Sequence, residues 1–302
     1  RLLILGASGY LGSFLKLYFM NSEYDVVSHS YSSNEDIVFD ASNYYDINAA
    51  LIKYSPQILI NTAGYTDVDG CESNPNQAYL VNAKIVDNIA KSIEVNRLDT
   101  HFIHISTDHV YDKKEGSFED EIVLQNYYAY SKFLGDIFAS RIDSTVLRTN
   151  FFGNNPKFKE KGFTGWIMKS LVSQKKINGF DDIYFNPLSL DTLADLINQV
   201  IKVKPFGIFN LGSLEGMSKL EFILTFAKKL GYSRDLIYAI PFIKGEKVQT
   251  KRPMSMIMNC KKIQNKLNIK LPTLSEEIDK VIESYIWGKS NYGDWRKRNK
   301  SK

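Results

Sequence analysis

Tyr128 and Lys132 are spaced as Tyr-x-x-x-Lys, a pattern that can deliver a proton to a substrate. On a helix, residues four apart lie on the same face, so the phenol and the ammonium can meet. An ammonium beside a phenol favours the phenolate and lowers the pKa of the tyrosine from about 10 towards neutral pH. Such a phenol can protonate a ketone oxygen while hydride reaches the carbon. The spacing also fits a core tyrosine with a solvated lysine one turn below, so it needs support from the rest of the chain.

The N-terminus provides support, because an apolar strand leads directly into a glycine-rich turn and a helix. Leu2–Leu5 is followed by Gly6, Gly9 and Gly12, and apolar residues then recur at helical spacing. The three glycines would allow a tight turn, close approach of the main chain to a pyrophosphate, and close packing of helix on strand. The helix N-terminus would face the phosphates of a dinucleotide. The spacing Gly-x-x-Gly-x-x-Gly is less common than Gly-x-Gly-x-x-Gly, and three glycines can also simply cap a turn.

The end of the second predicted strand, Asp25–Ser28, bears on the choice of nicotinamide cofactor. His29, Ser30 and Tyr31 stand there. An acidic residue at this point would accept the 2′-hydroxyl of NAD and repel the 2′-phosphate of NADP. Neither an acid nor an arginine is present. The 2′-phosphate of NADP would therefore be neither repelled by a carboxylate nor bound by a guanidinium group. We expect NADPH as the cofactor, with NADH also accepted.

Short apolar segments alternate with helical stretches along the first half of the chain. Strands are expected at Ile58–Ile60, His101–Ile105 and Thr145–Leu147, and a helix from Ala78 to Ile93. This alternation predicts an α/β fold with a doubly wound parallel sheet, a Rossmann domain covered by helices on both faces. Ligands of such sheets bind outside the carboxyl ends of the strands. Gly6, Ala63 and Thr107 each come at a strand end, so we expect them to meet at that edge.

These motifs, in this order, resemble the extended short-chain dehydrogenase/reductases, and more narrowly the dTDP-4-dehydrorhamnose reductases of bacterial sugar-nucleotide pathways. The resemblance runs nearly from end to end. The segments that carry it are Asn61–Asp69, Glu72–Pro75, Val81–Ala83, Ile105–Val110, Arg148–Phe151, Asn186–Pro187, Asp191–Ala194 and Arg252–Pro253. It implies an NAD(P)-binding Rossmann domain with a smaller, interleaved lobe that binds the substrate.

The resemblance also implies roles for individual residues. Thr107 would hydrogen-bond the substrate carbonyl, Tyr128 would donate the proton, and Lys132 would hold the nicotinamide ribose and tune Tyr128. The residues implied on the cofactor are Gly6, Gly9, Tyr10, Leu11, Gly12, Asp40, Ala41, Ala63, Gly64, Tyr65, Tyr128 and Lys132. Those implied on the substrate are Thr66, Thr107, Asp108, His109 and Phe151. Asp40 fits equally a turn residue at a strand end, and Tyr65 a packed loop aromatic.

Three positions depart from the family pattern. His109 stands where the family has tyrosine, Phe151 where it has tryptophan, and Met256 where serine is usual. The family touches its sugar at the first two positions, so the substrate can differ from the rhamnose precursor. Related 4,6-dehydratases carry a glutamate where His109 stands, and this Asp-Glu pair supplies the acid and the base that elimination of water needs. Asp108 is a single carboxylate, although His109, with a reference pKa of about 6.5, could act as a base.

A change in composition after Gly153 suggests the domain organisation. We expect residues 1–153 to form the NAD(P)-binding Rossmann domain, with return segments near 180–212, and residues 154–302 to form mainly the sugar-nucleotide-binding lobe. Phe206–Gly212 is expected to be a strand that returns to the main sheet. Ser218–Leu230 and Leu274–Tyr285 have the spacing of amphipathic helices.

Composition and charge restrict the partners. The 302 residues, 44% hydrophobic and 24% charged, suit one large α/β unit with a smaller lobe. Cys71 and Cys260 are too few for a disulfide framework, and no Cys/His cluster has metal-ligand spacing, so we expect no metal. The net charge of +4 depends strongly on the tail Trp295–Lys302, which we expect to be solvated. Neither a nucleic acid nor a membrane is therefore an expected partner.

The ends and the hydropathy of the chain suggest its location. It has no secretory segment and no apolar run of about 18 or more residues, so we expect a cytoplasmic protein. Because Arg1 directly precedes a strand, we expect a residue or two to be missing before it. Members of the family that the chain resembles are often dimers, which makes a homodimer an expectation too.

Together these features predict an NAD(P)H-dependent reductase of the C4 ketone of a nucleoside-diphospho-4-keto-6-deoxyhexose, in bacterial surface polysaccharide biosynthesis. Two alternatives stay open. A sugar-nucleotide epimerase would keep the same residues but recycle a retained NAD. A regulatory binding subunit resembling the β subunit of methionine adenosyltransferase would keep most motifs without turnover. The sequence leaves open which sugar and nucleotide are used and the stereochemistry at C4.

Overall fold

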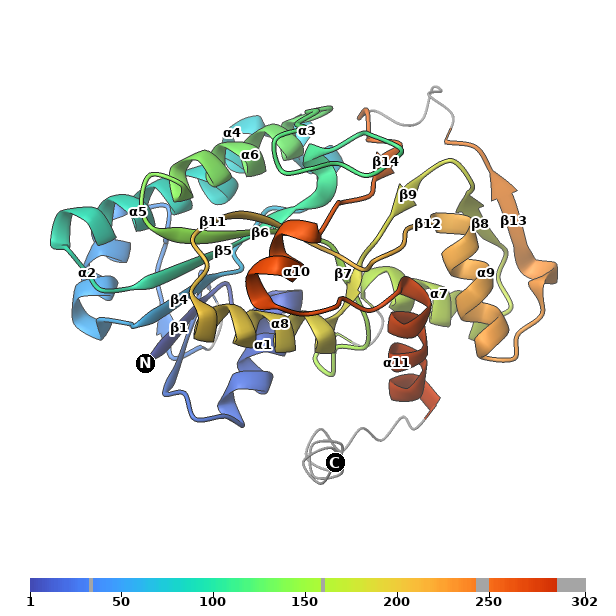
Figure 1. Cartoon of the computed structure of the whole chain (residues 1–302), viewed down its shortest axis with the longest axis horizontal. Coiled ribbons are helices and arrows are strands. Elements are labelled where there is room, and N and C mark those ends of the chain that lie inside the picture. The colour runs from blue at the N-terminus through green and yellow to red at the C-terminus, as the bar shows by residue number, and fades with distance from the viewer. Residues whose placement is uncertain (33–34, 159–160, 243–249, 287–302) are drawn as a thin grey trace.

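A parallel sheet of seven strands forms the larger part of the described molecule (Figure 1). The structure is a computed structural model, and it describes residues 1–32, 35–158, 161–242 and 250–286. The strands are β1 (Leu2–Leu5), β2 (Val26–Ser30), β3 (Ile37–Val38), β4 (Ile58–Asn61), β5 (His101–Thr107), β6 (Ser144–Thr149) and β11 (Gly207–Leu211). Each strand predicted from the sequence is present, including the returning strand β11, which pairs with β6.

The strand order, β11-β6-β5-β4-β1-β2-β3, confirms the doubly wound Rossmann topology. Every neighbouring pair is parallel. The direction of winding reverses between β1 and β4, where Leu5 is in register with Asn61. In sheets of this kind the crevice for a ligand lies at that reversal, outside the carboxyl ends of the strands.

Helices cover both faces of the sheet, which explains why the central strands are buried on both sides. One face is covered by α1 (Tyr10–Met20), α8 (Leu190–Val203) and α10 (Lys261–Leu267), whose apolar residues share a core with the sheet. The other face is covered by α2 (Tyr44–Tyr54), α5 (Ile85–Asn96) and α6 (Tyr127–Ala139). Figure 1 shows these two helical layers on opposite sides of the strands.

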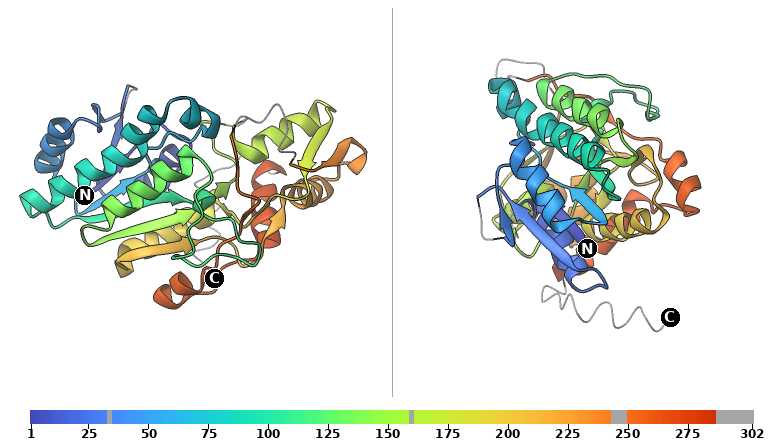
Figure 2. Two further views of the ribbon diagram at one scale, coloured as in Figure 1. Left: turned by 90° about the horizontal axis from the view of Figure 1, so that it is seen from above. Right: turned by 90° about the vertical axis from the view of Figure 1, so that its left-hand side faces the viewer.

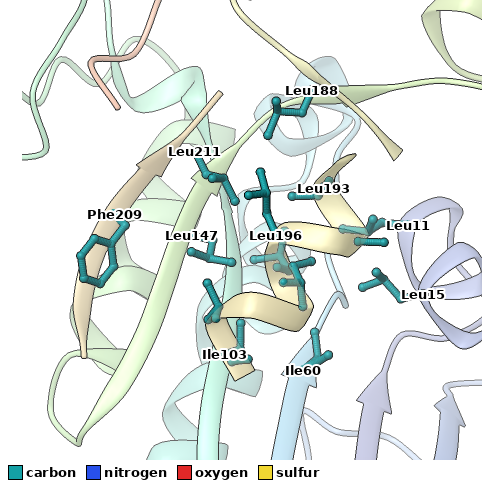
Figure 3. Close-up of a cluster of buried hydrophobic side chains, with 14 of the residues drawn as sticks. Leu11, Leu15, Ile60, Ile103, Leu147, Leu188, Leu193, Leu196, Phe209 and Leu211 are labelled. Carbon is teal, nitrogen blue, oxygen red and sulfur yellow. The ribbon is translucent and has the colours of Figure 1, made fainter. Parts of the chain in front are cut away.

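Helix α8 illustrates how the sequence pattern produces this packing. Its buried residues recur at helical spacing, from Leu193 through Ile197 to Val200, and form one apolar face. The Ser189 hydroxyl caps the helix by accepting the N–H of Thr192 at 3.2 Å. Figure 3 shows the leucines of α8 packed between the sheet and Leu11 and Leu15 of α1.

The helix expected from Ala78 to Ile93 is not regular throughout. It consists of α4 (Pro75–Tyr79), the π-helical turn η1 (Leu80–Lys84) and α5. The π turn contains Asn82, whose side chain is fully buried and bonded to a neighbouring loop. Single π turns inside helices often occur at functional sites. Side-chain periodicity does not distinguish such a turn from a regular helix.

A smaller lobe lies beside one end of the sheet (Figures 1 and 2). Its elements are α7 (Gly162–Val172), β8 (Ile177–Phe180), β9 (Tyr184–Phe185), β12 (Met217–Ser218), α9 (Lys219–Lys229), η3 (Arg234–Leu236), β13 (Ile237–Ile240), β14 (Ser255–Met256) and α11 (Leu274–Ile286). The two amphipathic helices predicted from the sequence correspond to α9 and α11. A core rich in phenylalanine, with Phe152, Phe185, Phe222 and Phe226, holds the lobe together.

The two parts are interleaved along the chain. After the first lobe segments, α8 and β11 return to the sheet, and α10 does so again near the C-terminus. Four short elements complete the description: α3 (Val68–Ser73), the 3-10 turn η2 (Asp108–Val110), and β7 (Phe151–Phe152), which pairs with β10 (Leu188–Ser189). Buried Glu277 of α11 links lobe and sheet layer by accepting the N–H of Ser189 and the hydroxyl of Thr192 at the start of α8. The division at residue 153 stays a prediction.

The predicted solvated tail Trp295–Lys302 lies outside the described residues. Across the described ranges, none of the helices has the length and apolar character needed to cross a lipid bilayer.

Candidate active site

The loops after β1 and β4 touch where the winding of the sheet reverses. Gly6 has φ +79°, and a Cβ on it would lie 2.6 Å from the main-chain nitrogen of Ala63. A Cβ on Gly12 would lie 2.2 Å from the carbonyl oxygen of Gly6. Both contacts are too short for any side chain, so these glycines allow the tight turn and the close helix packing expected from the sequence. Gly9 is the N-cap of α1. It is exposed to solvent at the carboxyl edge of the sheet.

Asn82 fixes the loop that follows β4. Its Oδ1 accepts the N–H of Tyr65 at 2.7 Å, and its Nδ2 donates to the carbonyl of Tyr65 at 3.0 Å. The same Nδ2 also donates to the Ser131 hydroxyl at 2.9 Å. The loop Ala63–Thr66 is thereby tied to α6, the helix of Tyr128 and Lys132. Asn82 carries no predicted role, although it lies in the motif segment Val81–Ala83.

Thr107, Tyr128 and Lys132 converge at the carboxyl end of β5. Thr107 is the last residue of that strand; its hydroxyl donates to Oδ1 of Asp108 at 3.4 Å and lies near enough to the Tyr128 phenol to act on its pKa. Lys132 donates from Nζ to the carbonyl oxygen of Ile105 at 2.8 Å. All three side chains are buried. The helix thus places the phenol and the ammonium on one face, against the strand end, as the spacing predicted.

The pKa of Tyr128 is opposite in direction to our expectation. We expected Lys132 to lower it, but burial raises the pKa of Tyr128, the hydrogen bond from Thr107 opposes this only in part, and the Asp108 carboxylate raises it further. Burial also lowers the pKa of Lys132 to about 8, while Asp136 acts to raise it. The expectation failed because the spacing of two residues does not report the desolvation of a phenol or the carboxylates around it.

Asp108 lies beside this group and is held by Asn150. The Nδ2 of Asn150 donates to Oδ2 of Asp108 at 2.7 Å. Burial raises the pKa of Asp108 to about 6, while Asn150 and the Lys219 ammonium act to lower it. Asn150 follows the end of β6 and lies in the motif segment Arg148–Phe151. It carries no predicted role, although its position at the end of a strand indicates a place in the site.

His109 packs edge-to-face on Tyr128, with ring centroids 5.3 Å apart. Burial, with smaller contributions from Lys219 and Arg252, lowers the pKa of His109 to about 3. The imidazole is therefore neutral at physiological pH. Its Nδ1 is buried and has no hydrogen-bond partner among the described residues. Arg252 forms an ion pair with Asp69 at 2.8 Å at the exposed side of this group.

Phe151 and Tyr10 stack on each other near the start of α1, with ring centroids 6.3 Å apart and planes 12° from parallel. Tyr10 donates from its hydroxyl to the carbonyl of Gly153 at 2.6 Å. Phe151 therefore packs against Tyr10, a residue implied on the cofactor. Leu11 is buried in the core, and Met256 is buried in the lobe core.

Asp40 and Ala41 follow β3 at the same edge of the sheet. Asp40 accepts the N–H and the hydroxyl of Ser42 at 2.9 and 2.7 Å, so it forms a local turn before α2. Ala41 is buried, and its carbonyl accepts a hydrogen bond from Asn88 at 3.2 Å. These bonds fit the turn role for Asp40, and its contact with the cofactor stays a prediction.

The second strand, β2, is longer than predicted. Acidic side chains from the segment after it form hydrogen bonds with it. His29 and Ser30 are buried within β2, whereas Tyr31 is 70% exposed. Glu35 accepts hydrogen bonds from the Ser28 hydroxyl at 2.9 Å and from Lys16 at 2.6 Å. Asp36 accepts the N–H of Ser28 at 2.8 Å. The strand end has no acid in the sequence, but folding brings two carboxylates to Ser28.

A buried charged network lies beneath Lys132. Asp136, one helical turn further along α6, accepts Arg148 Nε at 2.8 Å, and both side chains are at most 1% exposed. Arg148 also donates to the Tyr111 hydroxyl at 2.7 Å. The Tyr111 hydroxyl in turn donates to Asn210 of β11 at 2.6 Å. The network joins α6 to β6 and β11.

Comparison with known proteins assigns the family. Residues 1–286 match the family described as the RmlD substrate binding domain. The chain belongs to this family. A solved dTDP-4-dehydrorhamnose reductase-like structure from Sulfolobus tokodaii, described as hypothetical, has 30% identity and a TM-score of 0.80 over 92% of this chain and 98% of its own.

Further relatives and structures agree with membership of the RmlD family. A probable low-salt glycan biosynthesis reductase of Haloferax volcanii is 26% identical over 91% of this chain and 95% of its own length. A dTDP-4-dehydrorhamnose reductase of Mycobacterium tuberculosis is 32% identical over 65% of this chain and 64% of its own. The dTDP-4-dehydrorhamnose reductase of Bacillus anthracis, solved with NADP, shares the fold with 23% identity and a TM-score of 0.83 over 94% and 99% of the two chains.

Proposed function

We propose that the protein reduces the C4 ketone of a nucleoside-diphospho-4-keto-6-deoxyhexose with NADPH, or with NADH, in polysaccharide sugar biosynthesis. The observation that carries this proposal is the convergence of Thr107, Tyr128 and Lys132 at the carboxyl end of β5, at the same edge as the glycine turn after β1. The names of relatives from Mycobacterium tuberculosis and Haloferax volcanii support a reductase acting in glycan synthesis.

The chain's own residues fit a dinucleotide at this edge. Gly6 and Gly12 leave space that any Cβ would fill, and the N-terminus of α1 begins directly after Gly9. Tyr10, Leu11 and the loop Ala63–Tyr65 would line the cofactor through their main chain. The bound cofactor would supply hydride to the ketone carbon.

The protein supplies the proton and the positioning. The Thr107 hydroxyl would donate to the ketone oxygen and orient it towards Tyr128. Tyr128 would release its proton to that oxygen as negative charge develops there, so that the alcohol forms without a free alkoxide. The raised pKa of Tyr128 keeps this phenol protonated and ready to donate before the reaction. Lys132, fixed by Ile105, would hold the nicotinamide ribose and stabilise the phenolate that remains.

The two alternatives predict different behaviour of the cofactor. An epimerase would retain NAD through purification and show no net consumption of reduced cofactor. A regulatory subunit would bind cofactor without turnover and would be isolated with a synthetase. Neither alternative has a structural observation in its favour.

Mixing the protein with a panel of nucleotide-linked 4-keto sugars and following the absorbance of reduced nicotinamide tests the proposal. We expect stoichiometric consumption of NADPH with at least one dTDP-linked substrate. Absence of turnover across the panel, with intact cofactor binding, would contradict it. A homodimer and a cytoplasmic location stay predictions.

A further inference from the structure

Two fully buried polar side chains, Asn61 and His104, lie next to each other beneath the carboxyl edge of the sheet. Asn61 ends β4, His104 lies in the middle of β5, and the two residues are directly opposite in the register of these strands. Asn61 Nδ2 is 3.3 Å from Nδ1 of His104. A buried polar group costs free energy unless it is hydrogen-bonded, so each of these side chains depends on the other.

The Asn61 side chain directs the main chain as it leaves β4. Thr62 still bonds to β1, because its N–H donates to the carbonyl of Leu5 at 2.9 Å. The next N–H, that of Ala63, donates instead to Oδ1 of Asn61 at 3.1 Å. Gly6 packs directly on Ala63, since a Cβ on Gly6 would lie 2.6 Å from the Ala63 nitrogen. The Asn61 amide therefore holds the loop after β4 in place against the glycine turn.

The bond from Ala63 also determines which nitrogen of His104 carries the proton. Because Oδ1 of Asn61 accepts from Ala63, the Asn61 amide presents its Nδ2 donor to His104. Nδ1 of His104 is then the acceptor, and the proton of the neutral ring is on Nε2. Burial, with a smaller contribution from Lys132, lowers the pKa of His104 well below its ordinary value, which keeps the ring neutral. Nε2 lies 3.9 Å from Oδ1 of Asp136, longer than a hydrogen bond.

We propose that His104 is a positioning residue for the cofactor, because its Nδ1 holds the Asn61 amide and that amide holds the Ala63 main chain beside the glycine turn. The inference rests on the proposed function in one respect, that the dinucleotide lies along Ala63–Tyr65. His104 is fully buried, so it acts through Asn61 and not by touching the cofactor. Without an acceptor at Nδ1, the Asn61 amide would rotate and release Ala63. Cofactor affinity would then fall with the fraction of molecules in which the loop is in place.

Two substitutions of similar shape separate the acceptor from the packing of the ring. Leucine and asparagine both branch at Cγ, but only asparagine has an oxygen at the place of Nδ1. His104→Leu should weaken NADPH binding about tenfold in calorimetry, the size expected when a buried donor loses its acceptor. His104→Asn should restore most of that affinity. Both changes remove the ring and should lower the midpoint of urea unfolding, so stability alone would not favour asparagine.

His104→Gln provides a second variant without the acceptor. Its amide stands where Nε2 stood and leaves the place of Nδ1 empty. It should therefore weaken NADPH binding as His104→Leu does, and it replaces the leucine variant in the comparison with His104→Asn if that variant does not fold.

His101→Leu is the matched control. His101 is also buried in β5, and its Nε2 is 2.8 Å from the Thr145 hydroxyl. It begins the strand, at the opposite end from the cofactor edge. Its replacement should lower the stability of the fold and leave NADPH affinity unchanged.

Wild-type affinity in His104→Leu would overturn the inference. So would equal losses of affinity in His104→Leu and His101→Leu, or no recovery in His104→Asn. A wild-type protein that does not bind NADPH would overturn it together with the proposed function. Failure of the proposed reduction alone would be visible separately, as absent NADPH consumption with 4-keto sugars while the differences in affinity among the variants remain.

Discussion

Lys132 Nζ and the main-chain carbonyl of Ile105 are joined by a buried hydrogen bond of 2.8 Å. This bond ties α6 to β5 two residues before Thr107, so the helix that carries the phenol cannot shift along the strand that carries the hydroxyl. An ammonium fixed in this way keeps its position while a substrate binds and leaves. Preorganised groups of this kind lower the free energy of a transition state without reorganising at the moment of reaction.

The first prediction concerns the proton donor. Tyr128→Phe removes the hydroxyl but keeps the ring that packs on His109. Turnover should fall by about a hundredfold or more, because a positioned general acid contributes that much. Cofactor affinity, measured by calorimetry, should stay nearly unchanged. Retained turnover in this variant would rule out Tyr128 as the acid.

The second prediction concerns the cofactor. Because no acid occupies the strand end at His29–Tyr31, NADPH should bind at least as well as NADH. Calorimetric titration of both cofactors measures this directly. A preference for NADH of tenfold, about 1.4 kcal/mol, would mean that a residue outside the strand end makes the choice. Glu35, bonded to Ser28, would then be the first residue to replace by glutamine.

The third prediction separates reduction from dehydration. Elimination of water from a hexose needs an acid and a base next to each other. His109 cannot supply the base, because its pKa of about 3 leaves it a weak proton acceptor at neutral pH. The protein should therefore form no 4-keto-6-deoxy sugar from an unmodified dTDP- or GDP-linked hexose. Formation of that product without added NADPH, seen by mass spectrometry, would overturn the reductase assignment.

The fourth prediction concerns stability and pH. Burial holds the pKa of His109 at about 3 in the folded chain, below the value of about 6.5 for an exposed histidine. Between these values the unfolded chain binds a proton that the folded chain does not, so stability falls as the pH drops through that window. The slope from one such group is at most about 1.4 kcal/mol per pH unit. His109→Gln should show a smaller loss than the wild type in urea unfolding compared at about pH 7 and about pH 5.

His101 also has a lowered pKa, of about 4, and contributes to the slope in both proteins. The difference between wild type and His109→Gln therefore isolates His109. Identical losses in the two proteins would mean that His109 titrates normally in the folded chain.

The fifth prediction concerns the buried pair of Asp136 and Arg148. Asp136→Asn leaves the Arg148 charge buried without its carboxylate, which should destabilise the fold by about 3–5 kcal/mol. The double variant with Arg148→Met should be less destabilised than the sum of the single changes, because it removes the orphaned charge. Guanidinium unfolding of all four proteins measures this coupling. Additive effects would show that the pair does not act as a unit.

Replacement of Glu121 by glutamine is the control for that cycle. Glu121 pairs with Lys113 at the surface, where both side chains are accessible to solvent. Solvent screens such a pair, so the change should leave the unfolding curve almost unmoved.

The sequence by itself determined the local units of the fold. The apolar segment before Gly6, the helical spacing after it and the capping residues of α8 and α9 act within one or two turns of chain. Side-chain period and glycine conformation depend on neighbours along the chain, so they can be predicted from it. The meeting of Gly6 with Ala63 followed from the rule that parallel strands share a carboxyl edge, whereas the pairing of Tyr128 with Thr107 was implied by the resemblance to the family.

Only the tertiary structure decided which groups from distant segments face one another. The hydrogen bond of Asn150 to Asp108 and that of Ser28 to Glu35 depend on how the sheet and its loops pack. The same is true of the direction in which the pKa of Tyr128 shifts. Desolvation and charge interactions act through space over a few ångströms, and no spacing along the chain encodes those distances.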